Sequence, residues 1–506
     1  MRHFPDYPHY DGLGLAALVR TRQVTPLELV EAAIARIEAL NPGLNAVTLP
    51  LYEQARAAAA LVELGAPFAG VPMVLKDFWC TYAGIPTSAG NRLLRAIPRS
   101  RDSELVRRWK GAGALIVGKT NTPELALQAT TEPEAFGPTR NPWDLSRSPA
   151  GSSGGTAAAV AARLVPIGGA TDGGGSIRVP ASCCGLFGLK VSRGRTPSGP
   201  EHGEMWGGLG VEHVITRSVR DSAAMLDATA GLDPGAPYGL PAPARAFRDE
   251  VGAPVGRLRI AVTDRPLFGR SVDPACSAAL RDAATLLATL GHEVAEDAPA
   301  IDGAACARAM MTLVMVEIRV EIVAAARLAG RRPHPEDFEA ATYAAGLLGA
   351  ATGADAYVTA RHAVQRAARD VGRFFERYDL LVTPTLAQPP LPLGHFALTP
   401  AEAAALRVIN QLGAGWLLRA SGVADRIAAR LFDFMAFTPL FNLTGQPAMS
   451  VPLFWTDGGL PIGVQVVARY GDEAGLLRLA GHLEQARPWA NRAPPGYLDT
   501  PVPALT

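Results

Sequence analysis

The chain has 506 residues, of which 48% are hydrophobic, and its formal net charge is +1. A chain of this length can bury a large core. Its net charge is too small to attract nucleic acid, which we exclude as a partner. The first twelve residues lack the apolar segment of a signal peptide, and no apolar run reaches membrane-spanning length, so we expect a cytoplasmic protein.

The first clear helix signal lies near residue 25. Thr25 is placed to act as the N-cap, Pro26 occupies the first helical position, and Glu28 completes a capping box. We predict a helix over residues 25–40 that ends at the Asn-Pro-Gly sequence of residues 41–43.

Lysine is scarce in this chain. Only four of the 48 basic residues are lysines, namely Lys76, Lys110, Lys119 and Lys190. Arginine cannot lose its proton in a protein, whereas a buried lysine can. The sequence GVPMVLKDFWC places Lys76 at the end of a short apolar strand, which makes it a candidate base, whereas Lys110 has the context of a surface residue.

Residues 113–120 fit the GxxxxGK[ST] pattern of nucleotide-binding phosphate loops. That pattern requires a strand before the first glycine and a flexible loop between the glycines. Here we predict a helix over residues 103–110 and a buried strand over 114–119, which is the wrong order. Nucleotide binding is therefore kept only as an alternative of another functional class.

A serine-containing loop, SPAGSSGG, occupies residues 148–155. It matches the GxSxG nucleophile elbow with Ser153 at its centre. That elbow also needs a strand before it, and the preceding RNPWDLSRSPA is not suited to form one. We therefore do not predict an α/β-hydrolase.

A second serine-containing loop lies only 24 residues further on, in TDGGGSIRVPASCCG, where three glycines precede Ser176. Gly173, Gly174 and Gly175 can adopt unusual backbone angles and let their N–H groups converge on a negative oxygen. Ser176 then stands where a nucleophile would be placed.

The second half of the chain is expected to extend a sheet and cover it with helices. The patterns predict a strand–helix–strand unit with its helix capped at Asp273, helix over 303–377, a strand over 379–385, two helices over 400–435, and strands within 438–455 and 459–471. Trp416, Leu417 and Leu418 are expected to be exposed, where they would form a lid, a dimer face or a membrane contact.

The sequence places no histidine near these loops and gives the cysteines no catalytic or disulfide role. All nine histidines lie outside residues 10–201, and no HExxH metal motif occurs. The five cysteines form no CxxC pair and are odd in number, so we expect small buried side chains rather than a disulfide framework.

Together, Lys76, the Ser152 loop and the Gly173–Ser176 loop are the parts of an acyl-transfer site that uses lysine where others use histidine. GVPMVLKD, GKTNTPE, GPTRNPWD, SPAGSSGG and TDGGGSIRVPASCCGLFGLK follow one another in this order, with FNLTGQPA and GLPIGVQVV further on. In these motifs the chain resembles the amidase signature enzymes over about residues 10–490. In the segment TTEPEAFGPTRNPWDL and in Gln446, the chain most resembles the subgroup of 6-aminohexanoate cyclic dimer hydrolases.

The resemblance implies a role for each site residue. Ser176 would be the nucleophile, Ser152 the bridging serine with a cis peptide, and Lys76 the base. The oxyanion hole would consist of the backbone N–H groups of Gly173, Gly174, Gly175 and Ser176. The remaining site residues would support the loops, with two of them forming a structural ion pair: Ser153, Asp172 and Arg178.

The resemblance also implies an α/β fold, a single domain over residues 1–506 with a central mixed, twisted sheet covered by helices on both faces. Within it we expect a catalytic core at about 65–235, a helical elaboration at about 257–377, and C-terminal strands and helices at 378–495. No cofactor and no metal are expected, the expected partner is a small-molecule amide, and no membrane contact is needed. Because the family is often dimeric, a homodimer is a further expectation.

The chemistry requires a neutral Lys76. An ordinary lysine has a pKa near about 10.4, and burial among Val74, Leu75 and Phe78 would lower it toward about 7–8, where the amine can act as a base. The resulting expectation is an amidase that cleaves carboxylic amide C–N bonds through an acyl-enzyme, on apolar or oligoamide substrates that include cyclic and linear amides, anilides, carbamates or esters. The alternative within the family is the glutaminase subunit of a tRNA-dependent amidotransferase.

Overall fold

The structure, a computed structural model, describes residues 4–420 and 422–498. It is built on one mixed 11-stranded sheet with the order β1-β3-β2-β4-β6-β5-β10-β11-β9-β7-β8. The strands are β1 (Val47–Pro50), β2 (Pro72–Lys76), β3 (Leu115–Thr120), β4 (Ile167–Asp172), β5 (Phe187–Lys190), β6 (Val211–Thr216), β7 (Arg259–Val262), β8 (Glu293–Glu296), β9 (Leu380–Pro384), β10 (Ala448–Trp455) and β11 (Pro461–Ala468).

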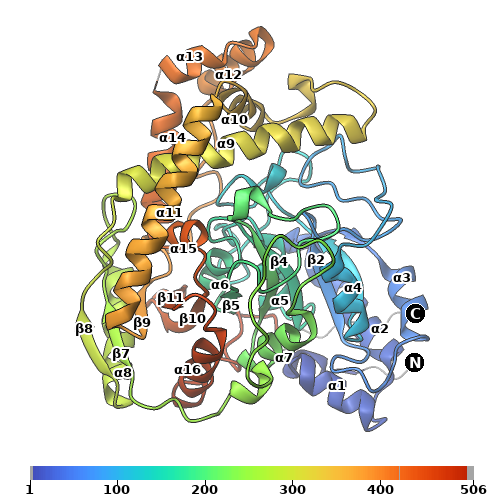
Figure 1. Ribbon diagram of the computed structural model, residues 1–506. Coiled ribbons are helices and arrows are strands. Elements are labelled where there is room, and N and C mark those ends of the chain that lie inside the picture. The colour runs from blue at the N-terminus through green and yellow to red at the C-terminus, as the bar shows by residue number, and fades with distance from the viewer. Residues whose placement is uncertain (1–3, 421, 499–506) are drawn as a thin grey trace.

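Helices cover both faces of this sheet, which confirms the α/β class (Figure 1). Those of the first half are α1 (Gly12–Arg20), α2 (Pro26–Leu44), α3 (Tyr52–Ala59), α4 (Glu104–Gly111), α5 (Gly154–Ala161), α6 (Arg178–Cys184) and α7 (Val219–Thr229). Those of the second half are α8 (Pro274–Thr289), α9 (Gly303–Leu328), α10 (Ala340–Ala350), α11 (Ala354–Arg377), α12 (Pro400–Leu412), α13 (Gly415–Ala420), α14 (Val423–Phe434), α15 (Pro439–Thr444) and α16 (Glu473–Ala486).

Three neighbouring strands bring the conspicuous motifs to one edge of the sheet. β2 runs parallel to β3 and to β4, with Leu75 opposite Gly169. Every residue of these strands is buried, as expected for a parallel region covered on both faces. Because parallel strands end at the same edge, Lys76 at the end of β2 and Asp172 at the end of β4 emerge there together.

Packing of α4 on the sheet depends on a glycine in β4. A Cβ at Gly169 would lie 2.8 Å from the Trp109 ring, which projects from α4 onto the strand. Because Gly169 has no side chain, the fully buried Trp109 indole can lie directly against β4.

The first predicted helix begins as expected but ends later. Thr25 and Glu28 form the capping box, with Pro26 in the first turn. The predicted end at residues 41–43 is wrong, because α2 continues through Pro42 to Leu44. The chain leaves the helix at Asn45, which has φ +52°, so the left-handed residue ends the helix and not the proline.

The helical region after β8 is more divided than predicted. The helix expected over 303–377 is three helices, and the first break contains Gly330, with φ +72° and two prolines downstream. The region 400–435 likewise forms three helices rather than two. The segment 438–455 contains an expected strand, β10, but it begins with the short helix α15, which Pro439 opens.

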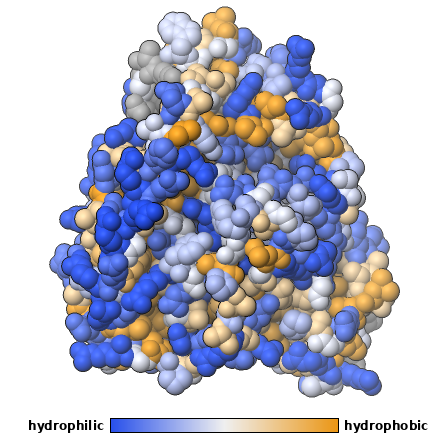
Figure 2. Space-filling view, viewed as in Figure 1, coloured by the Kyte–Doolittle hydropathy of each residue, from blue (hydrophilic) through white to orange (hydrophobic). Residues whose placement is uncertain are grey.

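Helices α9, α10, α12, α13 and α14 gather at one end of the molecule, at the top of Figure 1 and away from both termini. Trp416 on α13 is 67% exposed, as predicted, whereas Leu418 is 1% exposed because it packs against α10 and α12. Figure 2 shows hydrophobic residues gathered among hydrophilic ones over this end. Within residues 4–420 and 422–498, no helix is both long and apolar enough to cross a membrane. A lid or dimer role for this end stays a prediction.

Candidate active site

Lys76 lies at the carboxyl end of β2 and is completely buried. Its Nζ forms two hydrogen bonds of 2.6 Å, one with Ser152 Oγ and one with Thr171 Oγ1. The Phe78 ring centroid lies 5.7 Å from the same nitrogen. The structure thus brings together the predicted base and the predicted bridging serine, which are 76 residues apart in the chain.

Burial has the expected effect on this lysine. It lowers the pKa of Lys76 from 10.5 to about 7, although Cys80, Asp172 and Glu212 act in the opposite direction. The cause is desolvation, because a charged ammonium loses its water in this apolar environment. A substantial fraction of Lys76 is therefore a neutral amine at neutral pH.

The Ser152 loop is fixed against the end of β4. The Gly151–Ser152 peptide bond is cis, as the resemblance implied. Ser153 Oγ donates a hydrogen bond of 3.2 Å to Thr171 O, and Thr122 Oγ1 donates one of 2.9 Å to Ser152 O. Helix α5 begins directly after Ser153, and residues 141–150 contain no named strand, so the arrangement is not a nucleophile elbow.

The three-glycine loop connects β4 to Ser176. Gly175 has φ +138°, and a Cβ there would lie 2.4 Å from Thr438 Oγ1, so only glycine fits. Thr438 Oγ1 also donates a hydrogen bond of 2.8 Å to Gly174 O. The loop is therefore held in one conformation by a residue from α15's N-terminus.

The backbone N–H groups of this loop are available to a ligand. In the described part of the chain, the N–H groups of Gly174, Gly175 and Ser176 donate to no protein acceptor. Ser176 itself is half-buried, whereas its neighbours are buried. No hydrogen bond joins Ser152 to Ser176 within residues 4–420 and 422–498. Catalytic hydrogen bonds often form only when substrate is bound.

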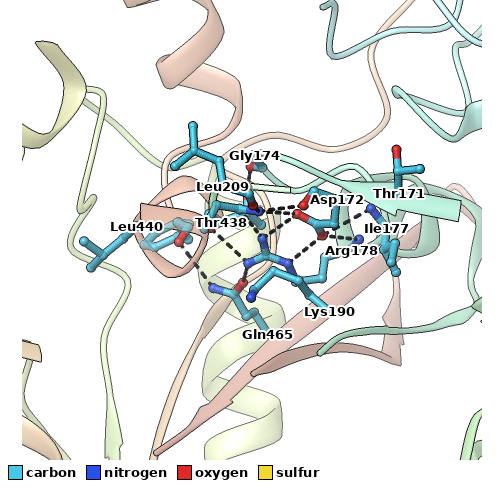
Figure 3. Close-up of polar contacts among 12 residues, drawn as sticks. Thr171, Asp172, Gly174, Ile177, Arg178, Lys190, Leu209, Thr438, Leu440 and Gln465 are labelled. Atoms are coloured by element: carbon cyan, nitrogen blue, oxygen red, sulfur yellow. Dashed lines mark hydrogen bonds and ion pairs between the residues drawn. The ribbon is translucent and has the colours of Figure 1, made fainter. Parts of the chain in front are cut away.

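Asp172 and Arg178 form a completely buried ion pair beneath the glycine loop (Figure 3). Arg178 donates to both carboxylate oxygens of Asp172, at 3.0 and 2.9 Å. Its remaining N–H groups are taken up by three acceptors, the Thr438 carbonyl, Gln465 Oε1 and Asn442 Oδ1. Burial by itself would raise the pKa of Asp172, but Arg178 outweighs it and holds the pKa at about 2.

Apolar side chains cover the glycine loop. The Trp206 ring would lie 3.0 Å from a Cβ at Gly173, and the Met310 and Met435 methyl groups would lie 3.0 and 3.4 Å from one at Gly174. Met310 comes from α9, so the helical end of the molecule reaches the site. These contacts leave an apolar environment next to the free N–H groups.

Lys119, the lysine of the phosphate-loop pattern, has a different structural role. It is completely buried and pairs with Asp77 at 2.8 Å, and it also donates to Thr87 Oγ1. Helix α4 precedes Gly113, as predicted, and β3 begins between the two glycines of the pattern and continues through Gly118 to Thr120. This segment therefore lacks the geometry of a phosphate loop. All five cysteines are free and buried, which confirms that prediction.

Four residues that contact the site were not singled out from the sequence. Thr171 stands in the TDGGGS motif and, as the residue before Asp172 on the same strand, could have been proposed as a partner of Lys76. Thr438, Asn442 and Gln465 lie more than 250 residues away in the chain. Asn442 and Gln465 stand in the FNLTGQPA and GLPIGVQVV motifs, but nothing in those motifs indicated a contact with Arg178.

Comparisons with known proteins show the family to which the chain is similar. The protein-family model described as Amidase matches residues 28–477. The 6-aminohexanoate-cyclic-dimer hydrolase of Paenarthrobacter ureafaciens is 38% identical over 491 residues, which are 96% of each chain.

Two solved structures are also similar to the chain over nearly its whole length. A 6-aminohexanoate cyclic dimer hydrolase complexed with substrate has a TM-score of 0.87 and 36% identity, covering 97% of this chain and all of the other. A bacterial aryl acylamidase of the amidase signature family has a TM-score of 0.83 and 28% identity, covering 97% of this chain and 98% of the other.

Proposed function

Because this chain belongs to the amidase signature family of hydrolases, we propose that it cleaves carboxylic amide bonds with Ser176 as nucleophile, Ser152 as bridging serine and Lys76 as base. The observation that carries the proposal is the 2.6 Å contact between the buried Lys76 Nζ and Ser152 Oγ. It supplies a proton acceptor next to a serine hydroxyl, and no histidine in the described part of the chain forms a hydrogen bond with Ser152 or Ser176.

The first half of the reaction forms the acyl-enzyme. Neutral Lys76 keeps one N–H on Thr171 and uses its lone pair to take a proton from Ser152, which takes one from Ser176 as that oxygen attacks the carbonyl carbon. The carbonyl electron pair moves onto oxygen, and the free N–H groups of the glycine loop bind the oxyanion. Each such donor is worth about 3 kcal/mol in the transition state.

Collapse of the tetrahedral intermediate breaks the C–N bond. Ser152 gives its proton to the leaving amine nitrogen, and Lys76 returns its proton to Ser152, so the amine leaves neutral and the acyl group stays on Ser176. Water then attacks the ester by the same route in reverse. The carboxylic acid leaves, and all three side chains regain their starting protonation states.

An apolar amide is the substrate class that the site favours. Trp206, Met310 and Met435 cover the glycine loop and present no charge to a substrate. The related proteins are named for the 6-aminohexanoate cyclic dimer and for aryl acylamides. We therefore place cyclic and linear oligoamides and anilides ahead of charged amides such as glutamine.

The pH dependence of hydrolysis tests the assignment of the base. Below a pH of about 7 Lys76 is an ammonium without a lone pair, and above it the amine is free. We expect kcat/KM on an apolar anilide to rise about tenfold per pH unit below this midpoint and to level off above it.

Two results, one from this pH profile and one from a substrate panel that includes glutamine, would contradict the proposal. A rate that stays flat from pH 5 to 9 would contradict Lys76 as the base. Hydrolysis of glutamine together with inactivity on every anilide and oligoamide would favour the amidotransferase subunit instead.

A further inference from the structure

Glu212 lies beside the Lys76 site but has no part in the proton transfers described above. It lies on β6 directly opposite Thr171 of β4 in the antiparallel ladder. Side chains directly opposite one another in such a pair project from the same face of the sheet. Since Thr171 bonds to Lys76 Nζ, this register places the Glu212 carboxylate on the lysine's side of the sheet.

Only one of the two carboxylate oxygens of Glu212 accepts a hydrogen bond from a described residue. Cys80 Sγ donates to its Oε1 at 3.1 Å, whereas Oε2 makes no hydrogen bond to any described residue. The residue is only 2% exposed. It nevertheless forms part of the wall of a cavity of about 380 Å³, together with Phe78, the residue whose ring lies against Lys76 Nζ.

The other acids around Lys76 already have cationic partners. Asp172 is paired with Arg178, and Asp77 is paired with Lys119. Burial raises the pKa of the Cys80 thiol well above its ordinary value, so Cys80 stays neutral and acts as a donor. Glu212 is thus the buried acid in this part of the described chain whose charge no arginine or other lysine balances.

Charged groups on the far walls of the cavity interact mainly with each other. Arg101 donates to Glu201 at 2.8 Å, and Glu321 on α9 accepts from Trp79 Nε1 at 3.2 Å. The further titratable or cationic groups that line it are Arg99 and His202. None of these groups contributes to the shifted pKa of either Lys76 or Glu212.

We propose that Glu212 is the charge partner of Lys76, a positioning residue that sets the lower pH limit of the reaction. The inference rests on the proposed function, since it requires Lys76 to act as the base. An ionised Glu212 favours the ammonium form of Lys76, and burial favours the amine. Their balance decides the pH at which the base becomes available.

The two groups titrate in the same range. Burial raises the pKa of Glu212 to about 7, against the lowering effects of Cys80 and Lys76. Burial lowers the pKa of Lys76 to about 7, against the raising effects of Cys80, Asp172 and Glu212. Removing the carboxylate charge should therefore lower the pKa of Lys76 further and extend activity to more acidic solution.

Glu212→Gln tests this inference through the rate at which a fluorophosphonate probe labels Ser176 between pH 5 and 9. We expect the midpoint of the acidic limb to fall, so that labelling near the wild-type midpoint is faster in Glu212→Gln than in the wild type. Loss of packing alone would slow labelling at every pH, so faster labelling in acid is specific to the charge. An unchanged midpoint would overturn the inference.

Matched variants separate charge from structure. Glu321→Gln removes a carboxylate from the same cavity and should keep the wild-type midpoint, whereas Glu212→Asp keeps the charge and should stay closer to wild type than Glu212→Gln. If Glu212→Gln does not fold, Glu212→Ala serves instead. Its midpoint should move in the same direction, and a midpoint that stays unchanged or rises would overturn the inference. A wild type that is not labelled at Ser176 at any pH would overturn the proposed function itself.

Discussion

Replacing Lys76 with arginine should lower kcat/KM for amide hydrolysis by at least about 10³-fold. Arginine keeps the positive charge and much of the length of lysine, but it does not release its proton at any pH at which the protein is folded. It therefore offers Ser152 no lone pair. In the described part of the chain Lys76 Nζ bonds only to Ser152 and Thr171, whereas an arginine there would have five N–H donors to satisfy.

Lys110→Arg is the matched control for this substitution. Lys110 lies on α4, pairs with Asp102 at 2.8 Å and lies over the Tyr82 ring. An arginine can keep both contacts, so the variant should retain wild-type kcat/KM and stability. Near-normal turnover by Lys76→Arg, measured beside this control, would remove Lys76 from the role of base.

Replacing Arg178 with methionine should lower the free energy of unfolding by about 3–5 kcal/mol and abolish activity. The substitution leaves Asp172 buried without its cation and removes hydrogen bonds to Thr438, Asn442 and Gln465. Two of these partners also hold the site, because Asn442 donates to Asp172 and Thr438 to Gly174. The glycine loop therefore loses its support together with the ion pair.

Arg220→Met is a control with nearly the same geometry at the surface. Arg220 makes a two-point contact with Asp11, at 2.6 Å for each bond, but 56% of its side chain is exposed. Asp11 is only 13% exposed, but the guanidinium lies largely in solvent, so the pair should contribute about 1 kcal/mol and this variant should unfold within about that range of the wild type in urea. Equal stability of the two variants would show that burial of the Asp172–Arg178 pair is not what stabilises the loop.

Local signals predicted much of the fold. The capping box at Thr25, the buried strand that ends at Lys76 and the Asp273 cap of α8 depend on adjacent residues, and the structure contains all three. Helix ends were harder, because Pro42 is accommodated within α2 and because Gly330 breaks a long alanine-rich region that composition alone marks as helical. Leu418 was misjudged because its burial depends on contacts with α10 and α12.

The site residues likewise fall into those that local sequence patterns predicted and those that only the three-dimensional structure revealed. The motif residues lie on segments that one strand edge brings together, so short sequence patterns were enough to nominate Lys76, Ser152 and Ser176. Thr438, Asn442 and Gln465 reach the loop from the far end of the chain, and their contribution depends on how the sheet closes around α15. Glu212 required the β4–β6 register, since only the pairing with Thr171 places it beside the lysine.

The most direct test of the account is the intact mass of the protein after incubation with a fluorophosphonate probe, measured for the wild type and for Ser176→Ala. The probe reacts with activated serines and presumes no particular substrate. The account predicts a single adduct on the wild type and none on Ser176→Ala. An adduct that persists on Ser176→Ala would contradict it and move the nucleophile elsewhere, with Ser153 as the first residue to examine.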